Sequence, residues 1–495
     1  MAEAVVIGAG IGGLSAAIAL AAAGERVRVL ERTALPGGKV GVRVLEGVEV
    51  DTGPSLLTLP GTLDDLFRLA GTSLSDQLSL RSHEPAFRYL FADGTRLYTF
   101  ASTEATLASV RETLGAAAES ELASFLAYAR RIWEAAAPRF VFGPAPEATL
   151  AELSGSGIPD LFRIDALRTM RGAIRSRVRS APLSKVLLRF ATYNGSDPRR
   201  APATLNCISW VELGLGGWGV EGGMYEIVRA LVRVAESLGV ELEYATDVED
   251  IVLGGEGDVR GVRSRDGREW PTRTVVGNAE AAHVLGELLP PHARQAQEGE
   301  PSMSAWTGIV RARRPAAEGA EPRAAHTVLF PGDYQAEFAS IFDARRSPAA
   351  PAAYVCAQEA CHGRIGWPED EPCFVMANAP AAEASPDSWE KLGERALARL
   401  TAAGMLAAGD RLLWSRTPAD LAADFPGSGG ALYGTASNGP WAAFRRPPNR
   451  VRAVPGLYLA SGSAHPGGGV PLCVLSGRAA AAAALEDLGV SAPGR

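Results

Sequence analysis

The feature that most constrains the fold is a glycine-rich turn near the start of the chain. Residues 4–7 are a short apolar run, the turn reads G-A-G-I-G-G, and an Ala/Leu-rich stretch without charges follows at 14–23. Strand, G-x-G-x-x-G turn and helix in this order are the setting in which the motif binds a dinucleotide. We expect Gly8 to make the tight turn, Gly10 to let the backbone approach a pyrophosphate, and Gly13 to allow close helix–strand packing.

An acidic residue follows the glycine turn at the distance that the motif requires. Residues 27–30 predict a second strand that ends at Glu31, 18 residues after Gly13, where roughly 20 are expected. The carboxylate can accept hydrogen bonds from an adenosine ribose and disfavours a 2′-phosphate, which leaves FAD and NAD. A Gly-Gly-Lys turn follows at 37–39. An acid followed by such a turn resembles flavoproteins of the amine oxidase and carotenoid desaturase superfamily, which implies FAD.

The last part of the chain carries a closer resemblance. Residues 456–471 read G-L-Y-L-A-S-G-S-A-H-P-G-G-G-V-P, which is similar to the signature of bacterial-type phytoene desaturases. Segments 189–203 and 378–380 are most similar to 1-hydroxycarotenoid (hydroxyneurosporene, methoxyneurosporene) 3,4-desaturases. The resemblance implies a FAD-dependent carotenoid desaturase acting at C3–C4 of a 1-hydroxy or 1-methoxy acyclic carotenoid, with non-covalent FAD. Cys473 is expected to be a packed thiol rather than a flavin attachment site.

The motifs and the resemblance together predict the cofactor contacts. Lys39 stands where many relatives have arginine, so a bidentate phosphate contact is expected to become a point charge. A helix N-terminus after the second glycine turn is expected to favour the anionic reduced flavin. The predicted FAD-binding residues are Gly8, Gly10, Gly13, Glu31, Arg32, Gly38, Lys39, Gly53, Pro54, Ser55, Val248, Gly462, Val470 and Pro471.

The expected fold class is α/β, with a doubly wound, Rossmann-like FAD-binding domain of the amine oxidase superfamily interleaved with an α+β substrate domain. A chain of 495 residues is long enough for about three domain-sized units. The FAD-binding domain is predicted from residues 1–80, 216–299 and 421–495. The substrate-binding, membrane-facing domain is predicted from 81–215 and 300–420.

Local patterns predict several further elements. Residues 103–133 are typical of a helix, and 274–278 are expected to return beside 259–264 after a turn at Asp266-Gly267. Strands of a second sheet are expected at 307–311, 327–330 and 374–377.

Desaturation removes a hydride to flavin N5 and a proton, and an allylic cation needs only a weak base. The candidate catalytic residues are Tyr193, Asp197, Glu212 and His465, each of which also has a structural interpretation. Asp197 precedes a proline and is typical of a turn, and Glu212 could form a salt bridge in the core. Tyr193 could pack in the core, and His465 could shape the rim of the flavin site. The catalytic base therefore stays open. An oxygen at the substrate's end needs a hydrogen-bond partner, for which Tyr193, Asn194 or Glu212 is expected.

Other functions remain as alternatives on this fold. They are a phytoene desaturase acting on successive bonds, a redox-neutral polyene isomerase or saturase, a flavin amine oxidase, and a lipid-binding escort protein without flavin. The intact glycine motif and Glu31 argue against the escort protein.

The composition limits the kinds of ligand and partner that the protein is expected to bind. The formal net charge of −7 offers no general field for nucleic acid. Five cysteines without a C-x-x-C and six histidines without ligand spacing predict neither disulfides nor a metal site. The uncharged residues 5–24 lack a basic leader and contain five glycines, so neither a signal peptide nor a transmembrane helix is expected.

One segment is basic in this acidic chain. Residues 161–190 carry seven arginines and Lys185 against the single acid Asp165, with apolar residues at helical spacing. We expect an amphipathic helix that docks on an anionic membrane surface; the alternative is an arginine face on a helix packed into the substrate domain. The protein is thus expected in the cytoplasm, peripherally bound to a membrane, with oxygen or a quinone as the electron acceptor.

Overall fold

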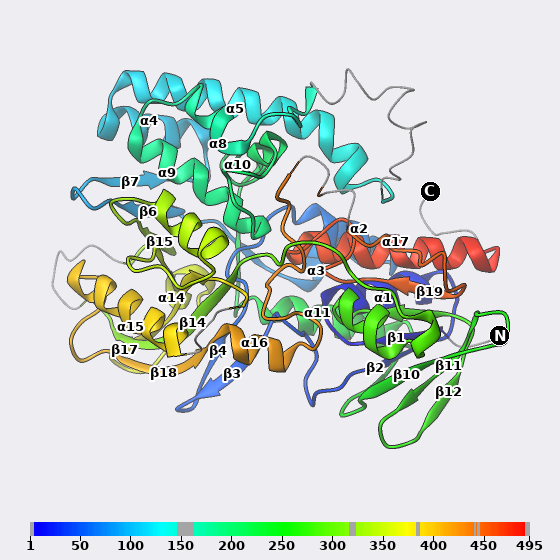
Figure 1. The fold of residues 1–495 in the computed structure, drawn as a ribbon. Coiled ribbons are helices and arrows are strands. Elements are labelled where there is room, and N and C mark those ends of the chain that lie inside the picture. The colour runs from blue at the N-terminus through cyan, green and yellow to red at the C-terminus, as the bar shows by residue number, and fades with distance from the viewer. Residues whose placement is uncertain are drawn as a thin grey trace.

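Two large sheets and a cap of helices make up the chain in a computed structural model (Figure 1). The structure describes residues 4–145, 163–315, 323–382, 387–439, 442 and 446–490.

The first sheet has five parallel strands in the order β19-β13-β1-β2-β9. Four of its strands are short and largely buried runs, as expected for a sheet that is covered on both faces, while the edge strand β9 is partly exposed. One face packs on three helices, and the other on an antiparallel meander. The strands are β1 Ala4–Ile7, β2 Val27–Leu30, β9 Glu241–Glu243, β13 Val275–Gly277 and β19 Leu457–Leu459; the helices are α1 Ile11–Ala22, α11 Tyr225–Ser237 and α17 Val470–Leu488; the meander is β10 Val248–Leu253, β11 Val259–Ser264 and β12 Glu269–Pro271.

The strand predicted at 274–278 forms, but the prediction of its pairing partner is wrong. The hairpin does turn at Asp266-Gly267, but β12 pairs with β11, while β13 joins the parallel sheet between β1 and β19. The run Val275–Gly277 is buried throughout, and such a run suits the interior of a sheet rather than an edge.

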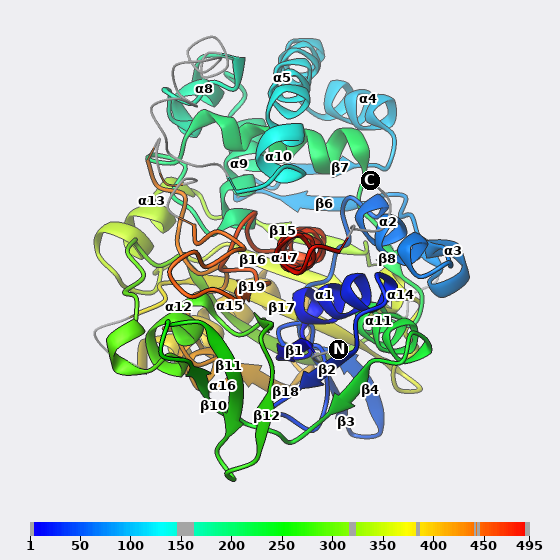
Figure 2. The same cartoon turned by 90° about the vertical axis from the view of Figure 1, so that its right-hand side faces the viewer.

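Helices α1 and α17 lie side by side over the parallel sheet (Figure 2). Their close approach depends on glycine, because a Cβ on Gly477 would lie 2.3 Å from the carbonyl oxygen of Gly12. A Cβ on Gly12 would lie 2.2 Å from the carbonyl oxygen of Ala460. The two glycine-rich turns that precede these helices are thereby held next to each other.

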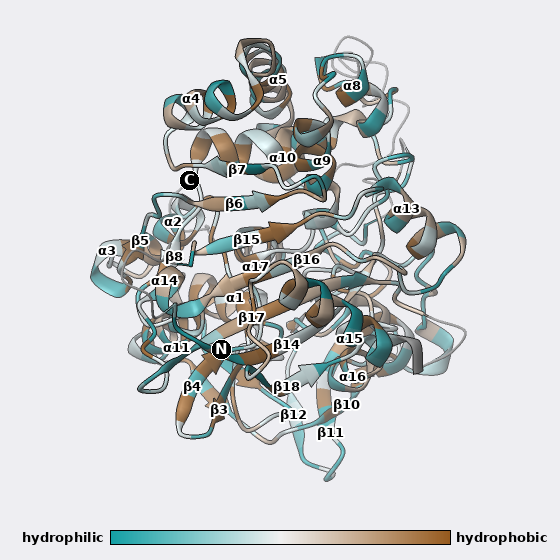
Figure 3. Cartoon of the chain, turned by 90° about the vertical axis from the view of Figure 1, so that its left-hand side faces the viewer, coloured by the Kyte–Doolittle hydropathy of each residue, from teal (hydrophilic) through white to brown (hydrophobic). Residues whose placement is uncertain are grey.

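The second sheet is mixed, with the order β18-β14-β17-β16-β15-β6-β7. Strands β6 and β15 contribute Phe87, Tyr89 and Val328 to a core shared with the helical cap. Hydrophobic residues gather on α9 and β17 (Figure 3). The strands are β6 Phe87–Leu90, β7 Arg96–Thr99, β14 Ser304–Arg313, β15 His326–Leu329, β16 Ala353–Ala357, β17 Asp370–Ala379 and β18 Arg411–Arg416; the cap helices are α4 Thr103–Leu114, α5 Ala116–Ala136, α8 Met170–Arg175, α9 Ala181–Arg189 and α10 Cys207–Trp210.

Both helices expected in this part of the chain are shorter than predicted. Gly115, with φ of 89°, breaks the expected helix over 103–133 into α4 and α5. The basic segment does not form one helix either: its described part, from residue 163, contains α8 and α9, separated by residues 176–180. Ser180 caps α9 by accepting a hydrogen bond from the backbone N–H of Leu183, which starts a new helix there.

Smaller elements connect the sheets. Asp51, at the end of β4, caps α11 by accepting hydrogen bonds from the backbone N–H groups of Met224 (2.8 Å) and Tyr225 (3.2 Å). Segments that are far apart in the sequence thus meet beside the parallel sheet. The exact domain limits stay a prediction. These elements are β3 Val42–Leu45, β4 Val48–Asp51, β5 Leu80–Arg81, β8 Gly219–Val220, α2 Gly61–Leu69, α3 Leu74–Gln77, α12 Ala281–His283, α13 Gln335–Phe338, α14 Gln358–His362, α15 Asp387–Ala402 and α16 Pro418–Asp424.

Candidate active site

A cavity of about 1450 Å³ extends from the glycine turn of α1 to the inner face of the second sheet. All of the predicted FAD-binding residues except Gly13 line it. Gly13 lies beneath the turn, where a Cβ would come within 2.1 Å of the Gly8 carbonyl oxygen, so its place agrees with the expected packing role.

The first glycine turn forms a wall without side chains. Gly8 has φ of 99°, and the backbone N–H of Gly10 donates to Asn278 Oδ1 at 2.8 Å. Gly37 and Gly38 face this turn, and the N–H of Gly37 donates to the carbonyl of Ala9 at 2.8 Å. Backbone exposed in this way leaves room for a diphosphate beside the N-terminus of α1.

Asn278 is a site residue that the sequence analysis did not single out. Its Oδ1 atom holds Gly10, and its Nδ2 donates to the carbonyl oxygen of Ala460 in the second glycine turn. Asn278 follows β13 directly, at the carboxyl edge of the parallel sheet. An Asn just after a buried strand was the available signal.

Glu31 lies at the same edge, at the end of β2, and is 9% exposed. Its Oε2 accepts a hydrogen bond from the backbone N–H of Ala9 at 2.7 Å, and Oε1 accepts from the backbone N–H of Thr33 at 2.8 Å. Thr33 Oγ1 also donates to Oε1, at 2.7 Å, so the carboxylate is fixed against the glycine turn and Oε2 keeps one lone pair for a ribose.

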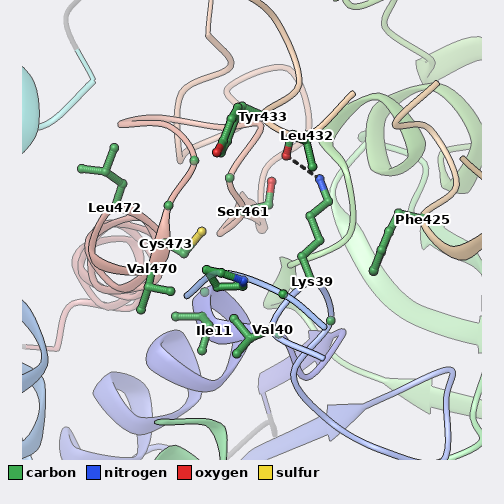
Figure 4. Close-up of a pocket in the computed structure, with 18 of the residues that line it drawn as sticks. Ile11, Lys39, Val40, Phe425, Leu432, Tyr433, Ser461, Val470, Leu472 and Cys473 are labelled. Carbon is green, nitrogen blue, oxygen red and sulfur yellow. Dashed lines mark hydrogen bonds between the residues drawn. The ribbon is translucent and has the colours of Figure 1, made fainter. Parts of the chain in front are cut away.

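Lys39 points away from the glycine turn. Its ammonium pairs with Glu280 Oε1 at 2.6 Å and donates to the carbonyl of Leu432 at 2.8 Å, with the Phe425 ring beside it (Figure 4). A phosphate contact from Lys39 stays a prediction, which would need this ion pair to open. Arg32 donates to the carbonyl oxygen of Asp424 at the cavity rim.

The second glycine turn leads into α17. Arg446, 7% exposed, holds it through the carbonyl oxygens of Tyr433 (3.1 Å) and Gly462 (3.2 Å), and burial lowers its pKa to about 10. The Cys473 side chain faces the cavity near Lys39 (Figure 4). Burial raises the pKa of this thiol to about 11, which keeps it protonated and weakly nucleophilic at neutral pH.

The far wall of the cavity is largely apolar and includes one buried cation, Arg189. Arg189 and Tyr193 line it, and Arg189 Nη2 lies 2.6 Å from Glu212 Oε1. Glu212 stands behind Arg189 and does not line the cavity. The surrounding apolar lining includes Phe87, Val328, Ala352, Phe374 and Met376.

The four catalytic candidates differ in their surroundings. Asp197 is fully buried, outside the cavity lining, and paired with Arg199 at 2.7 Å. Glu212 is committed to Arg189, and burial raises the pKa of Tyr193 well above its usual value, so its phenol stays protonated. His465 lines the cavity, and its Nε2 lies 3.1 Å from the carbonyl oxygen of Gly143. Burial lowers its pKa, so the imidazole is neutral at neutral pH, and its Nδ1 is the nitrogen left to accept a proton. The identity of the base stays a prediction.

Three potential metal ligands lie close together, although their spacing in the sequence does not indicate a metal site. Cys361 Sγ lies 3.6 Å from His83 Nε2 and 3.5 Å from His326 Nε2, all buried. The His326 ring also bonds through Nδ1 to Tyr354 OH at 2.7 Å, and Tyr354 OH is 2.6 Å from Ser55 Oγ. This network supports the cavity wall at Ser55.

Comparisons with known proteins agree with this geometry. Residues 11–360 match the family model of flavin containing amine oxidoreductases. The chain is 36% identical to a hydroxyneurosporene desaturase of Rhodobacter capsulatus, over 98% of both chains. The chain belongs to the carotenoid desaturases of the flavin-containing amine oxidoreductase family. It is also 28% identical to a 1-hydroxycarotenoid 3,4-desaturase of a Flavobacterium species, over 97% of this chain and 98% of that one.

A solved structure shows the same fold. Cyclohexylamine oxidase from Brevibacterium oxydans superposes with a TM-score of 0.58 at 17% identity, covering 99% of both chains. The predicted fold class is confirmed, and the cofactor of this desaturase family member is FAD. The glycine wall, Glu31 and the N-terminus of α17 fit that cofactor.

Proposed function

We propose that the protein is a FAD-dependent desaturase that introduces the C3–C4 double bond of an acyclic carotenoid carrying a 1-hydroxyl or 1-methoxyl group. The observation that carries this proposal is one cavity joining the glycine wall to a largely apolar chamber in which polar groups are few and include Arg189 and Tyr193. A long hydrocarbon with a single oxygen near one end matches that distribution of polarity.

The residues of the chain supply position and electrostatics. When bound, FAD accepts the hydride from the C–H bond beside the polyene. The apolar lining orients the chain and excludes water, while the N-terminus of α17 favours negative charge at the cofactor side by up to about 2 kcal/mol. His465 is the favoured proton acceptor, because its imidazole is neutral and faces the cavity. Oxygen or a quinone is the proposed electron acceptor.

An amine substrate is disfavoured by the aromatic residues of the chamber. Phe87, Phe190 and Tyr193 surround the Arg189 guanidinium, with its carbon 4.8, 4.8 and 5.0 Å from their ring centroids. Two rings of the cavity lining, Phe87 and Tyr193, are thus already occupied by the protein's own cation, which disfavours an ammonium group beside them.

The proposed route for the substrate is from a membrane. Phe140 and Val141 line the cavity, and the next residue, Phe142, is 52% exposed. Ala166 lines it too, and its neighbour Leu167 is 65% exposed. Among the described residues, no helix has the length and apolar character to cross a bilayer. The exposed Phe142 and Leu167 beside the cavity lining, and the charges of the described part of the basic segment, support docking of this rim on an anionic surface.

The proposal is tested by giving the flavin-loaded protein three substrates in liposomes: hydroxyneurosporene, its methoxy counterpart and phytoene. We expect the two oxygenated substrates to lose two hydrogens and to shift their absorption to longer wavelength, with phytoene the poorest. Equal rates, or a preference for phytoene, would assign a general phytoene desaturase instead. A product of unchanged mass would assign an isomerase.

A further inference from the structure

Two imidazoles and one thiol from distant parts of the chain meet behind the cavity wall. His83 follows β5, His326 begins β15, and Cys361 lies in α14. Cys361 Sγ is 3.6 Å from His83 Nε2 and 3.5 Å from His326 Nε2, and the three ligand atoms all lie within 4.8 Å of one another. The exposed fractions of His83, His326 and Cys361 are 7%, 0% and 0%, and none of the three lines the cavity. We call these three residues the thiol–imidazole cluster.

The distances in the cluster are those of ligands to one metal ion. Sulfur and nitrogen atoms that bind the same ion at about 2.3 and 2.0 Å are about 3.5 to 3.7 Å apart at tetrahedral or trigonal angles. The two S···N distances of the cluster, 3.5 and 3.6 Å, lie at this separation. Cys361 and either imidazole are therefore spaced to share one ion.

Outer contacts orient the imidazole of His326. Its Nδ1 lies 2.7 Å from Tyr354 OH, and this hydroxyl is 2.6 Å from Ser55 Oγ. An Nδ1–H that donates to the phenol leaves the lone pair of Nε2 on the side of Cys361, which is the usual arrangement of a metal-binding histidine. The carbonyl oxygen of Ser55 lies 3.6 Å from Cys361 Sγ and is available as a weak further ligand.

His362 is next to the cluster but cannot join it as a ligand. Its Nδ1 accepts a hydrogen bond from the backbone N–H of Val220 at 3.2 Å. The ring hydrogen of the neutral imidazole is therefore on Nε2, which has no lone pair to give to a metal. Cys356, His362 and Cys361 also lie within 4.8 Å of one another, but this second group lacks a free imidazole nitrogen.

The charge balance of the cluster favours a monovalent ion. One thiolate and two neutral imidazoles carry a single negative charge, so Cu⁺ gives a neutral site, whereas Zn²⁺ leaves a positive charge buried. The charged side chains that act on the two imidazoles are Arg81 and Arg189, both of which are cations. Their acidic neighbours, Glu221 and Glu212, are already paired with these arginines. Thiolate and imidazole are also ligand types that copper prefers.

We propose that His83, His326 and Cys361 form a binding site for Cu⁺, which goes beyond the proposed function. Cys361 gives its thiol proton to solvent as Sγ binds the ion, so one proton is released per ion and the copper stays Cu⁺. The ion joins three segments of the chain behind Ser55 and stabilises that part of the cavity wall. Sequence spacing predicted no metal here, because His83 and His326 are 278 and 35 residues from Cys361.

The test adds Cu⁺ without oxygen to the purified flavin-loaded protein, in competition with the coloured Cu⁺ chelator bicinchoninate. We expect one tightly bound Cu⁺ per chain and one proton released per ion. X-ray absorption at the copper edge should show one sulfur and two nitrogen ligands. Cu⁺ should raise the unfolding temperature, and Zn²⁺ should bind at least 100-fold more weakly.

Variants assign the ligands. Cys361→Ser removes the thiolate and should weaken Cu⁺ binding at least 100-fold, and His83→Leu should weaken it at least tenfold. His326→Phe should do the same while keeping a ring stacked on Phe87, which lies 4.6 Å from the His326 ring. The rise in unfolding temperature on adding Cu⁺ is measured within each variant, so a less stable variant still gives an answer.

Two other thiols serve as matched controls. Cys473→Ser and Cys356→Ser should bind Cu⁺ like the wild-type protein. A wild-type protein that binds no Cu⁺ would show that the thiol only forms hydrogen bonds with the imidazoles, and would overturn the proposal. Loss of binding in both Cys356→Ser and Cys361→Ser but not in His83→Leu would assign a pair of thiols instead, and tighter binding of Zn²⁺ than of Cu⁺ would overturn the monovalent ion. Desaturation is measured separately, so none of these outcomes contradicts the proposed function.

Discussion

Asn278 Oδ1 accepts a hydrogen bond from the backbone N–H of Gly10 at 2.8 Å, and the same side chain donates through Nδ2 to the carbonyl oxygen of Ala460. Gly10 and Ala460 lie at opposite ends of the chain, in the two turns that precede α1 and α17. One amide therefore sets the spacing between the two glycine turns that line the cavity.

Replacing this amide should loosen both turns. Asn278→Ala removes two partly buried hydrogen bonds, and we expect the free energy of unfolding to fall by about 2 kcal/mol. Flavin per chain, measured by absorbance after purification, should fall as well. The matched control is Asn438→Ala, which loses hydrogen bonds to Asp197 and Glu300 outside the cavity lining and should keep its flavin. Full flavin in Asn278→Ala would contradict the role of this amide.

A side chain at Gly10 should exclude the cofactor. Its Cβ would lie 2.6 Å from Asn278 Oδ1, so Gly10→Leu forces the turn apart and fills the wall that faces the diphosphate. We expect colourless protein. Gly61→Leu, at a position with no atom within 4 Å of the added Cβ, should stay yellow. If Gly10→Leu kept a full flavin spectrum, the assigned phosphate cradle would be wrong.

The glycine motif and Glu31 could be placed from sequence because local spacing determines them. Strand, turn, helix and acid lie within one βαβ unit, and the structure brings Gly8, Gly10 and Glu31 to one edge of the sheet. The C-terminal turn could be placed because its motif is long. In both cases, residues near each other in sequence form the site.

Contacts between distant segments could not be derived in this way. Asn278 acts on Gly10 across 268 residues, and Cys361 meets His326 and His83 through the pairing of different strands and turns. The burial of Arg189 and its ion pair with Glu212 were missed because its basic segment resembled one amphipathic surface helix. Ser180 begins a new helix instead, and that helix carries Arg189 into the core.

Cys473 should not hold the flavin covalently. Its pKa of about 11, raised by burial, leaves almost no thiolate at neutral pH. We expect acid or heat precipitation to release all of the flavin into the supernatant, from wild-type protein and from Cys473→Ser alike. Yellow precipitate from wild-type protein, absent in the serine variant, would overturn this.

Glu337 should make stability fall between about pH 4.5 and pH 7. Burial raises its pKa to about 7, from 4.5 when unfolded, so in this window the folded state binds the extra proton. Stability therefore decreases as pH rises through the window, by on the order of 3 kcal/mol, and levels off above it. Urea unfolding across this range should show the decline, and Glu337→Gln should remove that part of it. Glu298→Gln, at an exposed position, is the control and should leave the profile unchanged.

Two contributions to membrane docking can be separated by salt. Arg175 and Arg179 are exposed in the basic segment, and the attraction of each to an anionic surface amounts to about 1 kcal/mol and is screened within roughly 10 Å at 0.1 M salt. Phe142 and Leu167 bury apolar area, which salt does not screen.

The double variant Arg175→Glu/Arg179→Glu should therefore weaken binding to phosphatidylserine vesicles at least tenfold at low salt, and should have little effect at 1 M salt. The double variant Phe142→Ser/Leu167→Ser should weaken binding at both salt concentrations. Arg273→Glu/Arg452→Glu makes the same change of charge at exposed positions of the meander side and should leave binding intact. Both docking variants should retain flavin and act normally on detergent-solubilised substrate, because the cavity is unaltered, but slowly on substrate embedded in vesicles. Equal binding by all variants in a sedimentation assay would show that this rim packs as an ordinary protein surface and that the substrate arrives by another face.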